Sequence, residues 1–135
     1  LREIGADVKI EQLDSSAMFE KAVAGESDLS QLQWGFSDPT GMNIMWNSKN
    51  EGSGFNWAHI RDTKVDELLA AGDAATDAAE RARIYEELQK YIMDQAYVMP
   101  LYIITAYHAA SQEVKDVVIA PTARHVWFHK AYVEP

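Results

Sequence analysis

Cysteine is the first thing that this sequence lacks. None of its 135 residues is a cysteine, so the chain has no disulfide framework, no thiolate metal ligand and no thiol nucleophile. Basic residues are also few, because 12 lysines and arginines stand against 21 aspartates and glutamates, a formal net charge of -9. Binding to a phosphate backbone requires clustered basic side chains, so nucleic acid is not an expected partner.

Long apolar runs and low-complexity stretches are missing as well. The longest apolar runs, such as residues 98–104, fall far short of the roughly 20 residues that a membrane-spanning helix needs. What is present is typical of a folded globular protein, with 47% hydrophobic and 10% aromatic residues. A chain of this length predicts a single domain, residues 1–135, around one core.

The first part of the chain predicts a strand, a helix and a second strand. Polar and apolar residues alternate at 7–10, which is typical of a half-buried strand. Asp14 follows as an N-cap, and apolar residues at helical spacing lead to Gly25, a common helix stop. Because residues 29–34 suit another strand, this opening predicts a right-handed βαβ unit.

Two helices are predicted in the middle of the chain. Asp62 or Thr63 can cap the first, whose apolar stripe ends at Gly72. Asp77 and Glu80 form a capping box for the second. The second helix carries an apolar face predicted to be buried against a sheet, and pairs of opposite charge four residues apart on its solvated face. This face consists of Ile84, Leu88 and Ile92, and the pairs are Asp77 with Arg81 and Glu86 with Lys90.

Three later segments suit strands. They are residues 98–104, where Pro100 favours the start of a strand, residues 114–119 and residues 127–133. With the helices they predict an α/β fold whose sheet is mixed rather than strictly parallel. Residues 37–61 form the longest irregular region, which is either a binding loop or a plain surface excursion.

Four local patterns, in chain order, resemble the peptide/nickel-binding type of extracellular solute-binding proteins, family 5. Each is weak alone, but the ordered set extends from residue 1 to about residue 118. The patterns are Leu1-x-x-Ile4-Gly5-x-x-Val8-x-Ile10, Trp34 with Asp38-Pro39, Asn56 with the aromatic stretch before Lys64-Val65-Asp66-Glu67-Leu68-Leu69, and Glu80-Arg81-x-x-x-Tyr85-x-x-x-Gln89 followed by Met99-Pro100-Leu101-Tyr102.

The resemblance implies a larger protein. Members of this family are much longer, and this region corresponds to their last quarter, within the second lobe of a two-lobed clamp of periplasmic-binding-protein type II. We therefore expect a C-terminal fragment of lobe II, with the remainder of the same chain upstream. Residues 1–5, which suit the last turn of a helix, agree with an upstream beginning. The resemblance also implies a periplasmic or extracellular location, with any lipid anchor on the upstream part.

The same resemblance implies a function in transport. The expected role is capture of a peptide-like solute and its delivery to the membrane subunits of an ABC importer. A clamp of this kind binds with aromatic walls and a few polar groups, so we expect neither catalysis nor a cofactor. Because the other lobe would be missing from the isolated chain, its uncovered apolar surface is expected to favour self-association.

Candidate ligand contacts lie in the irregular region. In relatives that bind peptides, the loop opened by the matching tryptophan carries an aspartate that pairs with the α-amino group of the peptide. Here Asp38 follows Trp34 in a loop that looks shorter, so Asp38 either contacts the solute or only forms a turn before Pro39. Trp34 either faces the cleft or packs in the core. Loop packing is also the alternative for the other candidates, Phe36, Ser37, Asn56, Trp57 and His59.

Two other classes of function stay open. Asp38 with another acid could serve a carboxylate-based hydrolase, and exposed Trp46, Phe55 and Trp57 could anchor a partner protein. His125 and His129 stand four residues apart, but a strand is the expected conformation there, and on a strand they form no isolated zinc site. No metal site is therefore predicted.

Overall fold

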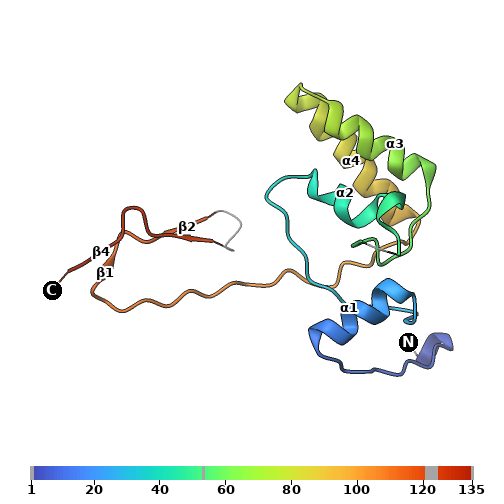
Figure 1. Ribbon diagram of the computed structural model, residues 1–135, viewed down its shortest axis with the longest axis horizontal. Coiled ribbons are helices and arrows are strands. Elements are labelled where there is room, and N and C mark those ends of the chain that lie inside the picture. The colour runs from blue at the N-terminus through green and yellow to red at the C-terminus, as the bar shows by residue number, and fades with distance from the viewer. Residues whose placement is uncertain (1, 53, 121–124, 135) are drawn as a thin grey trace.

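A hairpin of two long helices forms the best-packed part of the chain (Figure 1). The computed structural model describes residues 2–52, 54–120 and 125–134. Helix α3 (Thr63–Ala74) and helix α4 (Ala78–Asp94) begin at the predicted caps. The carboxylate of Asp62 accepts hydrogen bonds from the backbone N–H groups of Lys64 and Val65, and Asp77 accepts one from Glu80. Helix α3 continues two residues beyond Gly72, the predicted end.

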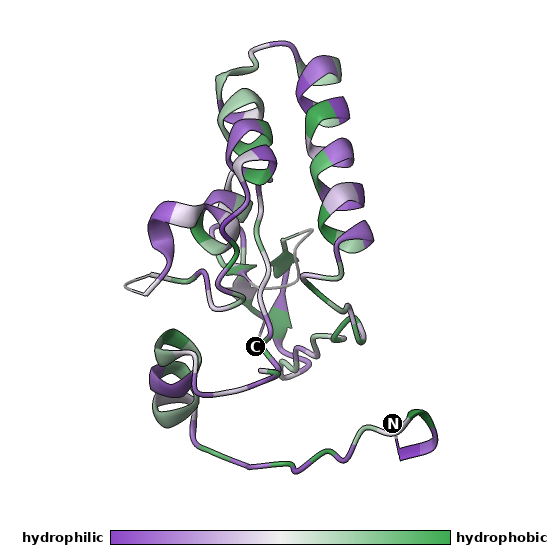
Figure 2. Cartoon of the chain, turned by 90° about the vertical axis from the view of Figure 1, so that its right-hand side faces the viewer, coloured by the Kyte–Doolittle hydropathy of each residue, from purple (hydrophilic) through white to green (hydrophobic). Residues whose placement is uncertain are grey.

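The hydrophobic core lies between these two helices. Figure 2 shows that the hydrophobic residues of the hairpin gather on the sides that face each other. Gly72 allows a close approach, because a Cβ atom there would lie 2.8 Å from the ring of Tyr85. The apolar face of α4 is buried as predicted, but against α3 rather than against a sheet. The core residues are Ile60, Val65, Leu69, Tyr85, Leu88 and Ile92.

One carboxylate closes the open end of the hairpin. The hydroxyl groups of Tyr91 and Tyr97 each donate a hydrogen bond to Asp62 Oδ2, at 2.9 Å in both cases. These bonds, together with two backbone N–H groups, lower the pKa of Asp62 although burial of the carboxylate opposes them. Asp62 therefore joins the start of α3 to the end of α4.

Shorter helices precede the hairpin. Arg2–Ile4 and Ser48–Asn50 are single 3-10 turns, and helix α2 is Gly41–Trp46. Helix α1 (Ser15–Ala24) begins at Asp14 and ends at Gly25, whose φ of 70° is left-handed, as predicted. Residues 37–61 are therefore less irregular than the sequence indicates. The side chains of Met42 and Trp46 on α2 pack against the core of the hairpin.

The described strands are short and pair only in antiparallel fashion. Strand β1 (Val114–Lys115) pairs with β4 (Tyr132–Val133), and β2 (Val118–Ile119) pairs with β3 (Val126–Trp127). The predicted strands at 114–119 and 127–133 are thus each divided in two. The prediction of a mixed sheet is wrong for the described residues, although the chain does combine helices with strands. Figure 1 shows this β region well away from the helices.

Three segments predicted as strands join no β-ladder in the described ranges. Residues 7–10, 29–34 and 98–104 run as irregular chain, so neither the βαβ unit nor a sheet flanked by helices is present there. Alternating and β-branched residues suit a strand locally, but a ladder also needs a neighbouring backbone. Many of their apolar side chains are exposed, Ile103 to 96%.

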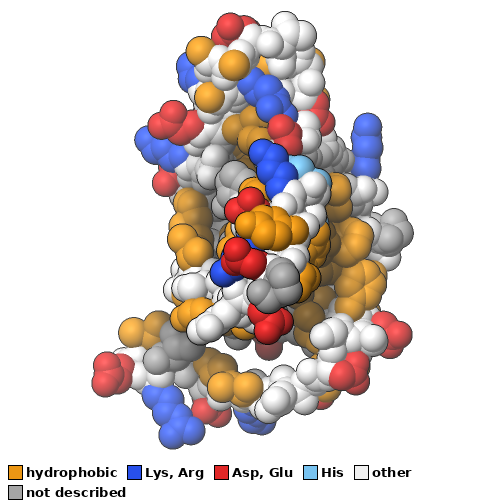
Figure 3. Space-filling view, turned by 90° about the vertical axis from the view of Figure 1, so that its left-hand side faces the viewer, with side chains coloured by type: hydrophobic (Ala, Val, Ile, Leu, Met, Phe, Trp, Pro, Cys, Tyr) orange, Lys and Arg blue, Asp and Glu red, His pale blue; other side chains and the backbone are white. Residues whose placement is uncertain are grey.

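The surface accordingly shows many hydrophobic side chains. In Figure 3 they lie among charged groups on the side where the β region projects. Exposed large side chains of the β region include Ile119, Trp127, Phe128 and Tyr132. Within the described ranges, no helix has both the length and the apolar character needed to cross a bilayer.

Candidate ligand-binding site

Five aromatic rings from three segments of the chain meet near the start of α2. Neighbouring ring centroids lie 4.9 to 5.8 Å apart, mostly edge to face, which is the favoured geometry for aromatic pairs. We call this group the aromatic cluster. It comprises Phe19 on α1, Trp34 and Phe36 before α2, and Phe55 and Trp57 after the second 3-10 turn.

The cluster is only partly covered. Trp34 is 38% exposed and Phe19 is similarly open, whereas the other three rings are half-buried. Trp57 Nε1 is buried and finds no hydrogen-bond acceptor among the described residues. An unsatisfied buried donor costs roughly 1–3 kcal/mol, so this indole N–H lowers the stability of the fold unless it gains an acceptor.

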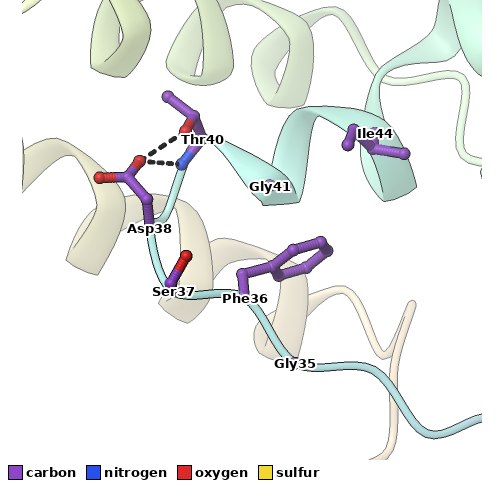
Figure 4. A pocket seen from close by; sticks show the side chains of 7 residues that line it. All are labelled: Gly35, Phe36, Ser37, Asp38, Thr40, Gly41 and Ile44. Atoms are coloured by element: carbon purple, nitrogen blue, oxygen red, sulfur yellow. Dashed lines mark hydrogen bonds between the residues drawn. The ribbon is translucent and has the colours of Figure 1, made fainter. Parts of the chain in front are cut away.

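An open hollow lies beside the cluster (Figure 4). The ring of Phe36 lies beneath the first turn of α2, where a Cβ atom on residue 41 would come within 2.0 Å of the ring. Gly41 is therefore required for this close approach. Ser37, a predicted contact, is exposed here. The lining residues are Gly35, Phe36, Ser37, Asp38, Thr40, Gly41 and Ile44.

The carboxylate of Asp38 is held on two sides. It accepts hydrogen bonds from the backbone N–H of Thr40 at 2.9 Å and from its hydroxyl at 2.5 Å. Arg81 Nη2 and Nη1 donate to its two oxygens at 2.7 and 3.3 Å. The bonds from Arg81, followed by those from Thr40, hold the pKa of Asp38 well below its usual range. Arg81 of α4 thus bonds a residue 43 positions away, whereas the sequence indicated Asp77 as its partner.

Asn56 and His59 have structural contacts. The side chain of Asn56 is 1% exposed, and its amide bonds the backbone of Asn47 and Ile60 through three hydrogen bonds. His59 Nε2 lies 3.1 Å from the carbonyl oxygen of Ala22, and Nδ1 lies 3.3 Å from Glu51 Oε1. Both residues thus have the packing contacts that were the alternative to ligand binding, and His59 fastens α1 to the loop that carries the cluster.

Glu51 completes the polar surroundings of this loop. It forms an ion pair with Arg61, which together with the hydrogen bond to His59 lowers the pKa of the Glu51 carboxyl. In the parts of the chain that the structure describes, no group of three or more histidine, aspartate or glutamate side chains could hold a metal ion. His129 lies against the ring of Trp127 instead, with centroids 6.5 Å apart.

The structure therefore gathers some of the predicted residues and separates others. Trp34, Phe36 and Trp57 meet in the cluster, and Ser37 and Asp38 lie in the adjoining hollow. The sequence missed Phe19 as a member, because its helical spacing indicated only the apolar stripe of α1. Whether these residues contact a solute stays a prediction. Trp34 is 38% exposed, and it does not end a strand, because residues 29–34 run as irregular chain.

Comparison with known proteins identifies relatives in one class. No protein-family model matches the chain, and no solved structure matches it significantly. The chain is 31% identical over 94% of its length to the probable D,D-dipeptide-binding periplasmic protein DdpA of Escherichia coli K12, covering 25% of that protein. It is 30% identical over 92% of its length to the probable di/tripeptide-binding protein 5 of Pseudomonas aeruginosa UCBPP-PA14, covering 24% of it.

A more distant relative comes from another bacterium. The chain is 21% identical over 87% of its length to the dipeptide-binding protein DppE of Bacillus subtilis 168 and covers 22% of it. The chain thus spans about a quarter of the length of the curated relatives it matches. The resemblance noted in the sequence is confirmed: the curated homologues of this chain are dipeptide- and tripeptide-binding periplasmic proteins of solute-binding protein family 5.

Proposed function

We propose that this chain is part of an extracytoplasmic solute-binding protein that captures a peptide-like solute for an ABC importer. The observation that carries the proposal is the similarity to peptide-binding periplasmic proteins over 94% of the chain. The proposed position is the C-terminal part of the second lobe. The protein would work in the periplasm or at the cell exterior, where an upstream lipid anchor could hold it.

The aromatic cluster is the proposed contribution of this chain to the solute site. Apolar rings that are already partly covered lose little further freedom when a solute displaces water from them. The N–H of Trp57 is buried without an acceptor among the described residues, so a carbonyl or carboxylate of the solute could reach it only if the neighbouring rings moved apart. Ser37 adds an exposed hydroxyl in the adjoining hollow. These are groups that bind and orient, and they need no catalytic machinery.

No observation favours the two alternative classes. A hydrolase that uses Asp38 as a general acid would need a raised pKa, and the pKa of this carboxyl is lowered by Arg81. The aromatic residues that could anchor a partner protein, Trp46, Phe55 and Trp57, are engaged in the cluster or pack against the helical core.

Self-association of the isolated chain through its exposed apolar segments is part of the proposal, and size-exclusion chromatography over a range of concentrations would measure it.

Titration calorimetry of the full-length protein with dipeptides and tripeptides tests this function. Trp34→Ala should weaken binding by about 2 kcal/mol, roughly 30-fold, if Trp34 is an aromatic anchor of the site. Trp127→Ala is the matched control, because Trp127 is an exposed tryptophan of the β region outside the cluster. Equal affinities in all three proteins would exclude the cluster from the site. Failure of the full-length protein to bind any peptide would contradict the function itself.

A further inference from the structure

We propose that Asp38 and Arg81 form a latch that positions the aromatic loop, residues 34–41, and that Asp38 does not receive the amino group of the solute. The inference rests on the proposed function, because it concerns how that site recognises its solute. It assigns Arg81, a residue outside the hollow, a positioning role. It also gives the aspartate beside Trp34 a role different from the one that its position in the sequence indicates.

Most acceptor sites of the Asp38 carboxylate are already engaged. A carboxylate offers about four acceptor sites. Four donor groups already reach Asp38: the backbone N–H and the hydroxyl of Thr40 and two guanidinium nitrogens of Arg81. Three of these bonds converge on Oδ1 and only the 3.3 Å bond from Nη1 reaches Oδ2, so an ammonium group could approach Oδ2 alone, beside a guanidinium that already compensates the charge of the carboxylate.

Arg81 is itself held in place by two contacts on the hairpin. Its Nε donates to the carbonyl oxygen of Gly72 at 3.3 Å, and its guanidinium carbon lies 5.3 Å from the ring centroid of Tyr85. Tyr85 is buried in the core and donates a hydrogen bond to Asp73 at 2.7 Å. Arg81 therefore points from a fixed place on the hairpin, which makes it a rigid anchor for a loop 43 residues earlier in the chain.

The latch holds the aromatic loop in place. Asp38 lies between Phe36 and the first turn of α2, where the ring of Phe36 fits only because residue 41 is glycine. Trp34, four residues before Asp38, contacts Phe36, Phe55 and Trp57. If Arg81 released Asp38, the segment would lose its polar attachment to α4. Affinity should then fall for every solute that uses the rings, with or without a free amino group.

The specificity that follows is for side-chain shape rather than for amino-group charge. The two carboxylates that lie on the loops of the cluster, Asp38 and Glu51, each pair with an arginine. The negative charge of these two carboxylates is thereby largely compensated. We infer that this half of the site selects solutes with apolar or aromatic side chains, through the exposed rings of Trp34 and Phe19.

The test uses the full-length protein with Asp38→Asn, Arg81→Gln and the double charge reversal Asp38→Arg/Arg81→Asp. Each is titrated with a phenylalanine-containing dipeptide and with its N-acetylated form. For a latch, both single variants lower the affinity for both ligands by the same factor, roughly fivefold, and the reversal recovers part of the loss. Arg83→Gln, an exposed arginine on the same helix, should leave both affinities unchanged.

Different results overturn the latch and the proposed function. If Asp38→Asn weakens only the dipeptide with a free amino group while Arg81→Gln has no effect, Asp38 is the amine anchor and the latch is wrong. If the wild-type protein binds neither these two ligands nor any other peptide, the proposed function fails, and urea unfolding of the present chain tests the latch alone. The losses caused by Asp38→Asn and Arg81→Gln should then be less than additive in the double variant, whereas fully additive losses would refute the pair.

Discussion

The helical hairpin and the three extended apolar segments have equally clear sequence patterns, but the hairpin buries its apolar side chains whereas the segments leave most of theirs exposed. Residues 63–94 bury most of their apolar face, because each helix meets its partner through a turn of three residues, 75–77. Residues 7–10, 29–34 and 98–104 have the composition of strands and no strand beside them. The difference teaches that a local pattern specifies a packed element only where the same stretch of chain also supplies the surface it packs on.

The largest effect is expected in the hairpin. Leu88 is 0% exposed in the core, so Leu88→Ala should lower the free energy of unfolding by about 2–5 kcal/mol through lost burial and a residual cavity. Met93 is an apolar residue of the same helix that is 48% exposed, and Met93→Ala serves as the control with a much smaller loss. Urea unfolding followed by circular dichroism measures both. Equal losses would show that the core is not where the structure has it.

A smaller effect is expected where the cluster loop joins the hairpin. Asn56→Ala removes three hydrogen bonds and leaves buried groups of Asn47 and Ile60 without partners. The expected loss of unfolding free energy is about 1–3 kcal/mol. Asn43→Ala is the control, because the amide of Asn43 bonds only an exposed carboxylate, that of Asp73. A loss no greater than that of the control would mean that water replaces these bonds and that the loop is less closely tied to the hairpin.

Alkaline pH gives a third test of the hairpin. Burial and the hydrogen bond to Asp73 raise the pKa of Tyr85 to about 12, above the ordinary value of 10.0. A raised pKa means that the folded state keeps the proton longer, so the stabilising contribution is complete below pH 10 and is lost as the pH rises towards 12. Between pH 9 and pH 11 the wild-type chain should lose about 1 kcal/mol more than Tyr85→Phe, in urea unfolding at both values. Tyr107→Phe, an exposed tyrosine, should behave as the wild type.

The smallest effect is expected in an extended segment. Ile103 is 96% exposed, so Ile103→Ala should change the unfolding free energy of this chain by less than about 0.5 kcal/mol. The comparison with Leu88→Ala uses the same experiment and a similar loss of side-chain atoms. A loss of several kcal/mol for Ile103→Ala would show that residues 98–104 pack against something in solution, such as a second copy of the chain, and concentration-dependent unfolding would identify that case.

What could be predicted from the sequence was whatever depends on near neighbours. Asp14, Asp62 and Asp77 were predicted as caps because a cap bonds backbone N–H groups two or three residues ahead. The burial of Ile84, Leu88 and Ile92 follows from their spacing on one face. The expectation that a sheet would cover them was wrong, because α3 covers them instead and strand pairing depends on residues far along the chain.

Long-range contacts of the candidate site were the ones that the sequence could not give. Arg81 has an aspartate four residues before it, and that spacing favoured a pair along the helix over the contact with Asp38, 43 positions away. Phe19 suited the stripe of its own helix, so nothing in its spacing indicated the rings of Phe55 and Trp57. The aromatic loop was found because the pattern of Trp34 with Asp38-Pro39 resembles a loop of family 5 solute-binding proteins.

Asp62 has a consequence for the order of folding. Its two tyrosine partners lie only 29 and 35 residues away, and the other end of the hairpin is closed by the covalent turn. Most backbone hydrogen bonds of the hairpin lie within its two helices and join residues near in sequence, a property that correlates with fast folding. We expect it to form first and to present Arg81 as a ready docking point, so that the earlier part of the chain, with its rings, assembles onto a surface that already exists.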